Sequence, residues 1–156
     1  MADHARWNAD RAASIIAEHR GREGATLPIL HALQDAFGHV PEQAIPLIAA
    51  ALNLTRAEVH GIASFYHDFR STPPGRHTLR LCRAEACQAM GAERLHEAAQ
   101  RRLGIGWHET TADGAVTLEP VFCLGLCAVA PSGMLDGAPL GRLDPAGLDA
   151  ALEGTR

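Results

Sequence analysis

The spacing of apolar residues divides the chain into a helical half and a half of mixed structure. Before the stretch "STPPG" (Ser71 to Gly75), each regular segment repeats its apolar residues every three or four positions. These segments are "NADRAASIIAEHRG", "TLPILHALQDAFG", "PEQAIPLIAAALN" and "TRAEVHGIASFY". Such spacing puts the apolar side chains on one face of a helix. The first half is therefore predicted to be a small bundle of helices.

Polar residues and prolines predict where these helices begin. Asn8 and Thr26 precede or open two of the periodic segments and are predicted to cap them. Pro46 either costs the third helix a hydrogen bond or lies at its true start. Thr55 and Glu58 have the spacing of a capping box, in which each side chain satisfies a backbone N–H group at the helix start.

The second half alternates between strand and helix patterns. "HTLRLC" reads as a strand, and "CQAMGAERLHEAAQRRLG" reads as one helix that stops at Gly104. Asp-Gly pairs inside "TTADGAVT" and "GMLDGAPLGRL" predict two turns between short strands. Asp144 is predicted to cap a last helix. The predicted fold class is therefore α/β (α+β), with a helical bundle over residues 1–74 and a mixed sheet covered by helices over residues 75–156.

Composition and charge argue against nucleic-acid-binding proteins and membrane or secreted proteins. The 156 residues carry a net charge of -4 and contain no lysine, which argues against nucleic-acid binding. The longest apolar stretch, "AIPLIAAALNL", is too short to span a bilayer, and the first residues lack the apolar core of a secretion signal. We therefore expect a cytoplasmic protein without membrane insertion. Thiols stay reduced in that compartment, so the four cysteines are expected to be ligands or free thiols.

The histidines and large aromatic residues are predicted to be structural. His31, His39, His60 and His67 show no metal-binding spacing, and His96 is predicted to be solvated on its helix. Trp107 and Phe122 are predicted to lie in the core.

The cysteines form two pairs. Cys82 and Cys87 have four residues between them, Cys123 and Cys127 have three, and 35 residues separate the pairs. A structural zinc site usually has tighter pairs with two residues between them, as does a redox-active dithiol. A 2Fe-2S cluster tolerates wider pairs, because each of its two irons takes two thiolates. Spacing alone leaves a cluster, zinc, disulfides and unliganded cysteines all open.

The cysteine pattern, with "CLGLCAVAP" at its second pair, resembles the thioredoxin-like 2Fe-2S subunit family that includes the 24 kDa subunit of respiratory NADH dehydrogenase. The stretch "GHVPEQAIPLIAAALNLTRAEVHGIASFYHDF" is similar to the N-terminal region of that family. The resemblance implies that Cys82, Cys87, Cys123 and Cys127 ligate one 2Fe-2S cluster and that the second half has a thioredoxin-like fold. It also implies a partner subunit that carries FMN, the NAD site and a further iron-sulfur cluster.

The first cysteine loop points to a narrower group. "CRAEACQAMG" resembles the gamma subunit of soluble, NAD-dependent, molybdenum-containing formate dehydrogenases, which implies a catalytic molybdenum subunit as second partner. The alternative is the equivalent subunit of a NADH:quinone oxidoreductase or an NAD-reducing hydrogenase. The chain has no glycine-rich dinucleotide loop, so we expect neither an NAD or flavin site nor a complete active site with catalytic residues on it.

A redox-sensing transcription regulator is a remote alternative, suggested by "LTRAEVHGIASFYHDF". Residues 1–74 contain six arginines against eight acidic residues, so they offer no basic recognition face.

Arg83 directly follows Cys82, and its position suggests a hypothesis about the midpoint potential of the cluster. Reduction makes a cluster more negative, so a neighbouring positive charge favours the reduced form. Arg83 is therefore a candidate for raising the midpoint potential. The competing interpretation is a solvated side chain that pairs with Glu85.

Overall fold

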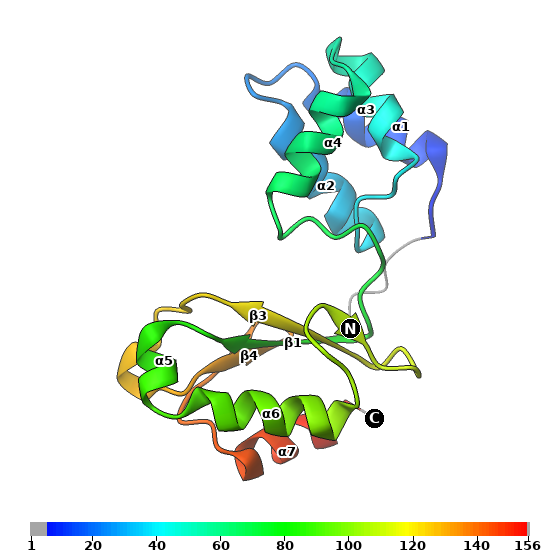
Figure 1. Ribbon diagram of the computed structural model, residues 1–156. Helices are drawn as coiled ribbons and strands as arrows, with labels where there is room; N and C mark the ends of the chain where they lie inside the picture. Colours follow the sequence, from blue (N-terminus) through cyan, green and yellow to red (C-terminus); the bar gives the residue numbers. More distant parts are fainter. Residues whose placement is uncertain (1–5, 156) are drawn as a thin grey trace. The chain divides into compact units, whose positions relative to one another are not determined.

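The computed structural model describes residues 6–155 and consists of two compact units (Figure 1). The boundary between them falls between Pro73 and Pro74, inside the "STPPG" stretch. Among the described residues no helix combines the length and apolar character that crossing a bilayer requires.

The N-terminal unit contains four α-helices. These are α1 (Ala9–His19), α2 (Thr26–Phe37), α3 (Ala44–Leu52) and α4 (Arg56–Phe65). Their apolar faces meet in one core, whose largest fully buried side chains are Ile29, Leu30, Leu33, Phe37, Ile48 and Val59. The predicted helical half is thus present, and its core is built from the periodic positions of the sequence.

The predicted helix starts are confirmed in three places and wrong in one. Asn8 accepts a hydrogen bond from the N–H group of Arg11, and both hydrogen bonds of the capping box at the start of α4 are formed. Pro46 is the third residue of α3, where a helix has no partner for the N–H group that proline lacks. Thr26, however, is the first residue of α2 and not its cap, because Ala25 occupies that position without a side-chain hydrogen bond.

The C-terminal unit is built on a five-stranded mixed sheet in the order β2-β3-β1-β4-β5. Its strands are β1 (His77–Cys82), β2 (Glu109–Thr110), β3 (Val116–Val121), β4 (Gly133–Leu135) and β5 (Ala138–Leu140). The central strand β1 pairs in parallel with β3 and antiparallel with β4. The predicted fold class, with a mixed sheet in the second half, is confirmed.

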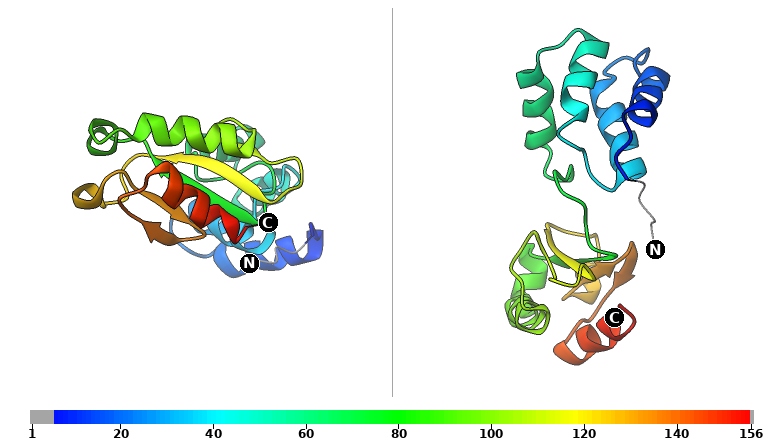
Figure 2. Two further views of the ribbon diagram at one scale, coloured as in Figure 1. Left: turned by 90° about the horizontal axis from the view of Figure 1, so that it is seen from below. Right: turned by 90° about the vertical axis from the view of Figure 1, so that its right-hand side faces the viewer.

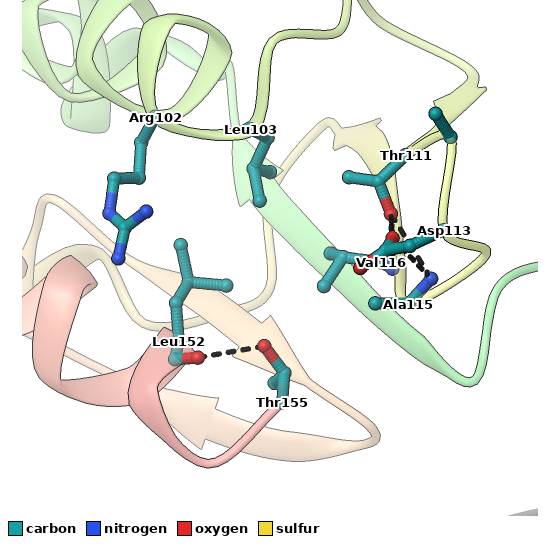
Figure 3. A pocket seen from close by; sticks show the side chains of 9 residues that line it. Arg102, Leu103, Thr111, Asp113, Ala115, Val116, Leu152 and Thr155 are labelled. Atoms are coloured by element: carbon teal, nitrogen blue, oxygen red, sulfur yellow. Dashed lines mark hydrogen bonds between the residues drawn. The ribbon is translucent and has the colours of Figure 1, made fainter.

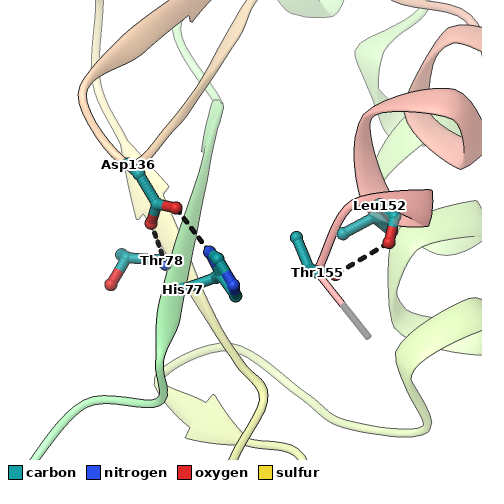
Figure 4. Close-up of polar contacts among 5 residues, drawn as sticks. All are labelled: His77, Thr78, Asp136, Leu152 and Thr155. Atoms are coloured by element: carbon teal, nitrogen blue, oxygen red, sulfur yellow. Dashed lines mark hydrogen bonds and ion pairs between the residues drawn. The ribbon is translucent and has the colours of Figure 1, made fainter. Parts of the chain in front are cut away.

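Both Asp-Gly pairs form turns, as predicted. The turn between β4 and β5 holds Asp136 and Gly137 at positive φ angles of 50° and 86°. The Asp136 carboxylate accepts a hydrogen bond from the N–H group of Thr78 at 2.8 Å and lies 2.5 Å from Nδ1 of His77 (Figure 4). Burial raises the pKa of Asp136, but the hydrogen bonds from His77 and Thr78 outweigh this effect and hold the pKa below its ordinary value. The turn is thereby fastened to the start of β1.

Two long helices cover one face of the sheet (Figures 1 and 2). They are α6 (Ala92–Leu103) and α7 (Pro145–Glu153), joined by a hydrogen bond of 3.0 Å from Arg102 Nε to Asp149. Asp144 caps α7, as predicted. The core between helices and sheet includes Leu79, Leu81, Leu95, Leu118 and Leu148.

The prediction of one helix between Cys87 and Gly104 is wrong. A short helix α5 (Glu85–Ala89) ends before α6 begins, and Gly91 between them has a φ angle of 86°. This left-handed conformation interrupts a right-handed helix and is available to glycine without strain. Cys87 therefore lies on α5, separated from the long helix.

Candidate metal centre

The first cysteine pair lies where the central strand ends. Cys82 is the last residue of β1 and Cys87 is on α5, and both are buried. Burial raises the pKa of the Cys82 thiol. Hydrogen bonds from the N–H group of Ala84, the Cys87 thiol and the N–H groups of Cys123 and Leu124 outweigh burial and hold that pKa below its ordinary value. The surroundings of Cys82 therefore favour a thiolate.

The second pair follows β3, with Cys123 in a loop and Cys127 at the start of the 3-10 helix η1 (Cys127–Val129), and both cysteines are exposed. The sulfur atoms of Cys123 and Cys127 are 3.7 Å apart, and the N–H group of Gly125 donates to the Cys123 sulfur at 3.4 Å. Cys123 and Gly125 have positive φ angles of 78° and 76°. These turns direct successive N–H groups toward sulfur, as in loops that bind anions through their backbone.

The two loops are brought together by the pairing of β1 with β3. Cys82 is opposite Val121 in this parallel pair, so the loops after both strands lie at the same edge of the sheet. The pKa of Cys127 is raised, first by its hydrogen bond to Cys123 and then by repulsion from the negative charge of Cys123, with smaller contributions from burial, Cys87 and Cys82. The structure thus collects all four predicted ligands in one region.

The donor set fits a 2Fe-2S cluster. All four cysteines are free thiols, they are arranged in two pairs, and backbone N–H groups point at two of the sulfurs. Each iron of such a cluster takes two thiolates, and hydrogen bonds to sulfur stabilise their charge. Within residues 6–155, no three His, Cys, Asp or Glu side chains are grouped so that they could hold a single metal ion.

His96 lies behind Cys82, contrary to the prediction that it is solvated. It is 2% exposed, and its Nε2 atom is 3.1 Å from the carbonyl oxygen of Cys82. The helical repeat explains the burial, since His96 shares a face of α6 with Ala92 and Ala99, which are both buried. The histidine therefore supports the backbone of a proposed ligand.

Further side-chain contacts link Arg83 through Trp107 to His96. The guanidinium carbon of Arg83 lies 5.2 Å from the centre of the Trp107 ring, and the rings of Trp107 and His96 pack in a T-shaped arrangement with their centres 5.3 Å apart. In the described part of the chain the guanidinium pairs with this indole and not with Glu85. Trp107 is partly buried against the core of the sheet, as predicted.

Phe122 is not a core residue, so that prediction is wrong. It follows the last residue of β3 and its side chain is 71% exposed. Phe122 lies between the end of β3 and the positive φ angle of Cys123, outside the regular strand. Met90 is exposed as well, at 63%.

The other predicted structural histidines belong to the N-terminal unit, whereas the four cysteines belong to the C-terminal unit. His31 packs edge-on against Phe69, and Nδ1 of His39 is 2.9 Å from the carbonyl oxygen of Phe37. His60 and His67 are exposed.

Ser132 is a neighbour of the cysteines that the sequence did not reveal. Its hydroxyl lies 3.4 Å from the Cys87 sulfur, and its carbonyl oxygen accepts a hydrogen bond from the N–H group of Cys82 at 3.0 Å. Nothing in the pattern of the sequence singles out this serine, because the contact depends on where the chain returns beside β1.

A hollow of about 350 Å³ lies at the opposite end of the strands (Figure 3). It is lined by residues of α6, α7 and the β2–β3 turn, including Arg102, Thr111 and Asp113. The Thr111 hydroxyl donates to Asp113 at 2.5 Å, and Arg102 is paired with Asp149. These polar side chains already have partners within the protein, and no cysteine lines the hollow.

Residues 12–156 match the family described as thioredoxin-like 2Fe-2S ferredoxin. The chain belongs to this family. A NADH-quinone oxidoreductase subunit from Pseudomonas aeruginosa is 40% identical over 129 residues, which are 83% of this chain and 78% of that protein. Another such subunit, from Rhizobium meliloti, is 39% identical over 143 residues, which are 92% of this chain and 85% of that protein.

A solved structure of a larger protein is also similar. The NAD+-reducing NiFe hydrogenase in its H2-reduced state aligns with 81% of this chain at 31% identity and a TM-score of 0.68. This chain spans 22% of that hydrogenase chain. The predicted family and the thioredoxin-like fold are therefore confirmed.

Proposed function

We propose that the protein transfers single electrons as the 2Fe-2S subunit of an NAD-dependent oxidoreductase complex. The observation that carries this proposal is the collection of four free cysteines, as two pairs, at the edge where β1 and β3 end. Cys82 and Cys87 would bind one iron, and Cys123 and Cys127 would bind the other. When bound, the cluster would accept one electron and release it again.

The surroundings of the cysteines suit this task. The buried pair, Cys82 and Cys87, keeps water from one side, and the exposed pair, Cys123 and Cys127, leaves the other side open to a redox partner. A reduced flavin carries two electrons and can release them one at a time, so a subunit with FMN and the NAD site is the proposed partner.

We propose formate dehydrogenase as the most specific assignment, with the overall reaction of formate and NAD+ giving CO2 and NADH. Support for it is the sequence "CRAEACQAMG" of the first cysteine loop, which includes Arg83. A molybdenum subunit would oxidise formate, and the flavin subunit would reduce NAD+. The chain itself would act in the cytoplasm and supply no catalytic residue.

The relatives favour a second candidate. Their names are those of NADH-quinone oxidoreductase subunits and of an NAD+-reducing hydrogenase. The same chain could serve in such a complex, because a carrier of single electrons beside a flavin is required in each.

The cluster is tested by electron paramagnetic resonance on the full chain after reduction with dithionite. We expect a rhombic spin-one-half signal with about two iron atoms and two sulfides per chain. Cys123→Ala should lose the signal, whereas Phe122→Ala, a change at the neighbouring exposed residue, should keep it. A colourless wild-type protein that contains zinc, or an iron-replete protein without a signal, would show the proposal to be wrong.

The complex is tested by purifying the tagged chain from its own cells with its associated subunits. Formate-dependent reduction of NAD+ by a preparation that contains molybdenum and flavin would support formate dehydrogenase. NADH-dependent quinone reduction, or hydrogen-dependent reduction of NAD+ with nickel present, would replace it by the second candidate.

A further inference from the structure

Ser132 is buried against a proposed cluster ligand. The residue is 1% exposed, and its Oγ atom lies 3.4 Å from the sulfur of Cys87, which is also 1% exposed. For the described residues, this contact is the one hydrogen bond that the Ser132 hydroxyl makes. A buried hydroxyl without a partner is costly, so the contact with Cys87 lowers the cost of burying this serine.

The direction of this hydrogen bond is fixed once Cys87 binds iron. Between a thiol and a hydroxyl, either group can donate. A ligating cysteine has lost its proton and can accept but not donate. The serine must then donate its hydroxyl proton to the Cys87 sulfur.

A donor at this position acts on the reduction equilibrium. Reduction adds one electron and, in this step, no proton, so the cluster and its four thiolates become more negative. A hydrogen bond to sulfur is stronger when the sulfur carries more negative charge. We propose that the Ser132 hydroxyl raises the midpoint potential of the cluster by stabilising its reduced form, an inference that rests on the proposed function.

The backbone holds the hydroxyl in place. The carbonyl oxygen of Ser132 accepts a hydrogen bond from the N–H group of Cys82, and the next residue, Gly133, pairs with Leu81 of β1. A Cβ atom on Gly133 would lie 2.9 Å from the carbonyl oxygen of Arg80, so the strands approach closely here. Ser132 is thus tied to β1 on one side and contacts Cys87 on the other.

The test is a potentiometric titration of the full chain, followed by electron paramagnetic resonance. Ser132→Ala removes one oxygen atom and keeps the rest of the side chain. We expect it to lower the equilibrium constant for one-electron reduction by up to about tenfold, which corresponds to about 59 mV. The matched control is Thr155→Val, which removes a buried hydroxyl that donates to Leu152 and lies outside the cysteine region (Figure 4). It should leave the potential unchanged.

Ser132→Thr separates hydrogen bonding from packing. The threonine keeps the donor but adds a methyl group, so a potential near that of the wild type supports the hydrogen bond. A shift as large as that of the alanine variant would mean that side-chain size matters instead, and would overturn the inference.

Failure of this inference can be told apart from failure of the proposed function. If the wild type gives the cluster signal but Ser132→Ala titrates at the same potential, the serine does not tune the cluster and the proposed function stands. If the iron-replete wild type gives no signal, the proposed function fails and this inference fails with it.

Discussion

Arg83 places a permanent positive charge next to a proposed ligand. Its guanidinium group is held over the face of Trp107, and an arginine above an aromatic ring is attracted to the negative charge of the ring face. Trp107 in turn packs against His96, which contacts the carbonyl oxygen of Cys82. The charge is therefore fixed by packing near the end of β1, whereas a solvated arginine would move freely and be screened by water and salt.

We expect Arg83→Gln to lower the midpoint potential by tens of millivolts, because it removes a positive charge that stabilises the reduced cluster. A tenfold change in a one-electron equilibrium corresponds to about 59 mV. Arg101→Gln is the control, since it removes the same charge from an exposed position in the last turn of α6. Redox titrations that give equal potentials for both variants would identify Arg83 as a mere surface residue.

Trp107 offers an independent check on the same charge. Trp107→Leu should lower the potential by less than Arg83→Gln, because the charge remains but is no longer held. In the double variant Arg83→Gln/Trp107→Leu, the tryptophan substitution should lower the midpoint potential little further than Arg83→Gln alone, since the two residues act through one contact.

The sequence could predict the burial or contacts of some residues around the cysteines but not of others. The burial of His96 could be read from the helical repeat that it shares with Ala92 and Ala99. The exposure of Phe122 depends on the left-handed turn at Cys123, and a non-glycine residue gives no sign of such a turn. The contact of Ser132 with Cys87 joins residues 45 positions apart, so no local pattern could indicate it.

Local signals predicted most of the helices and strands. Caps at Asn8, Thr55 and Asp144 and both Asp-Gly turns are present, because the hydrogen bonds of the caps and the φ angles of the turns involve neighbouring residues alone. The break at Gly91 was missed because a glycine inside a helical pattern can either continue or end the helix. The order of the strands depends on pairing across long separations, which no local pattern indicates, and the family resemblance implied only a thioredoxin-like fold.

The capping box at the start of α4 provides a test at the level of one helix. The Thr55 hydroxyl accepts from the N–H group of Glu58, while the Glu58 carboxylate accepts from the N–H group of Thr55 at 2.8 Å. Thr55→Ala should lower the free energy of unfolding of the helical unit by about 1 kcal/mol. Trp7, which packs against Phe37 in that unit, reports the unfolding by fluorescence when Trp107 is replaced by phenylalanine.

Gly61→Ala is the matched change of opposite sign in the same helix. A Cβ atom at Gly61 meets no atom within 4 Å, and alanine favours a helix interior over glycine by roughly 0.5–1 kcal/mol. Stabilisation by Gly61→Ala together with destabilisation by Thr55→Ala would show that α4 limits the stability of the unit. If neither variant changed the free energy of unfolding, α4 would be shown to open without unfolding the rest of the helical unit.

The two compact units have separate cores. The buried residues between Ala12 and Val59 form one cluster, and those between Leu79 and Leu152 belong to others. All four proposed ligands belong to the C-terminal unit. A bound cofactor stabilises those parts of a protein whose opening would release it.

Removal of iron should therefore lower hydrogen-exchange protection in the C-terminal unit alone. After treatment with a chelator and a reductant, hydrogen-deuterium exchange followed by mass spectrometry should show lost protection in β1, β3 and α5. Peptides from α2, whose core residues Ile29, Leu30 and Leu33 belong to the N-terminal unit, should keep their protection. Treatment of the Cys123→Ala variant, which should not hold the cluster, should change neither unit. Equal loss of protection in α2 and β1 would mean that the units unfold together and that iron stabilises both.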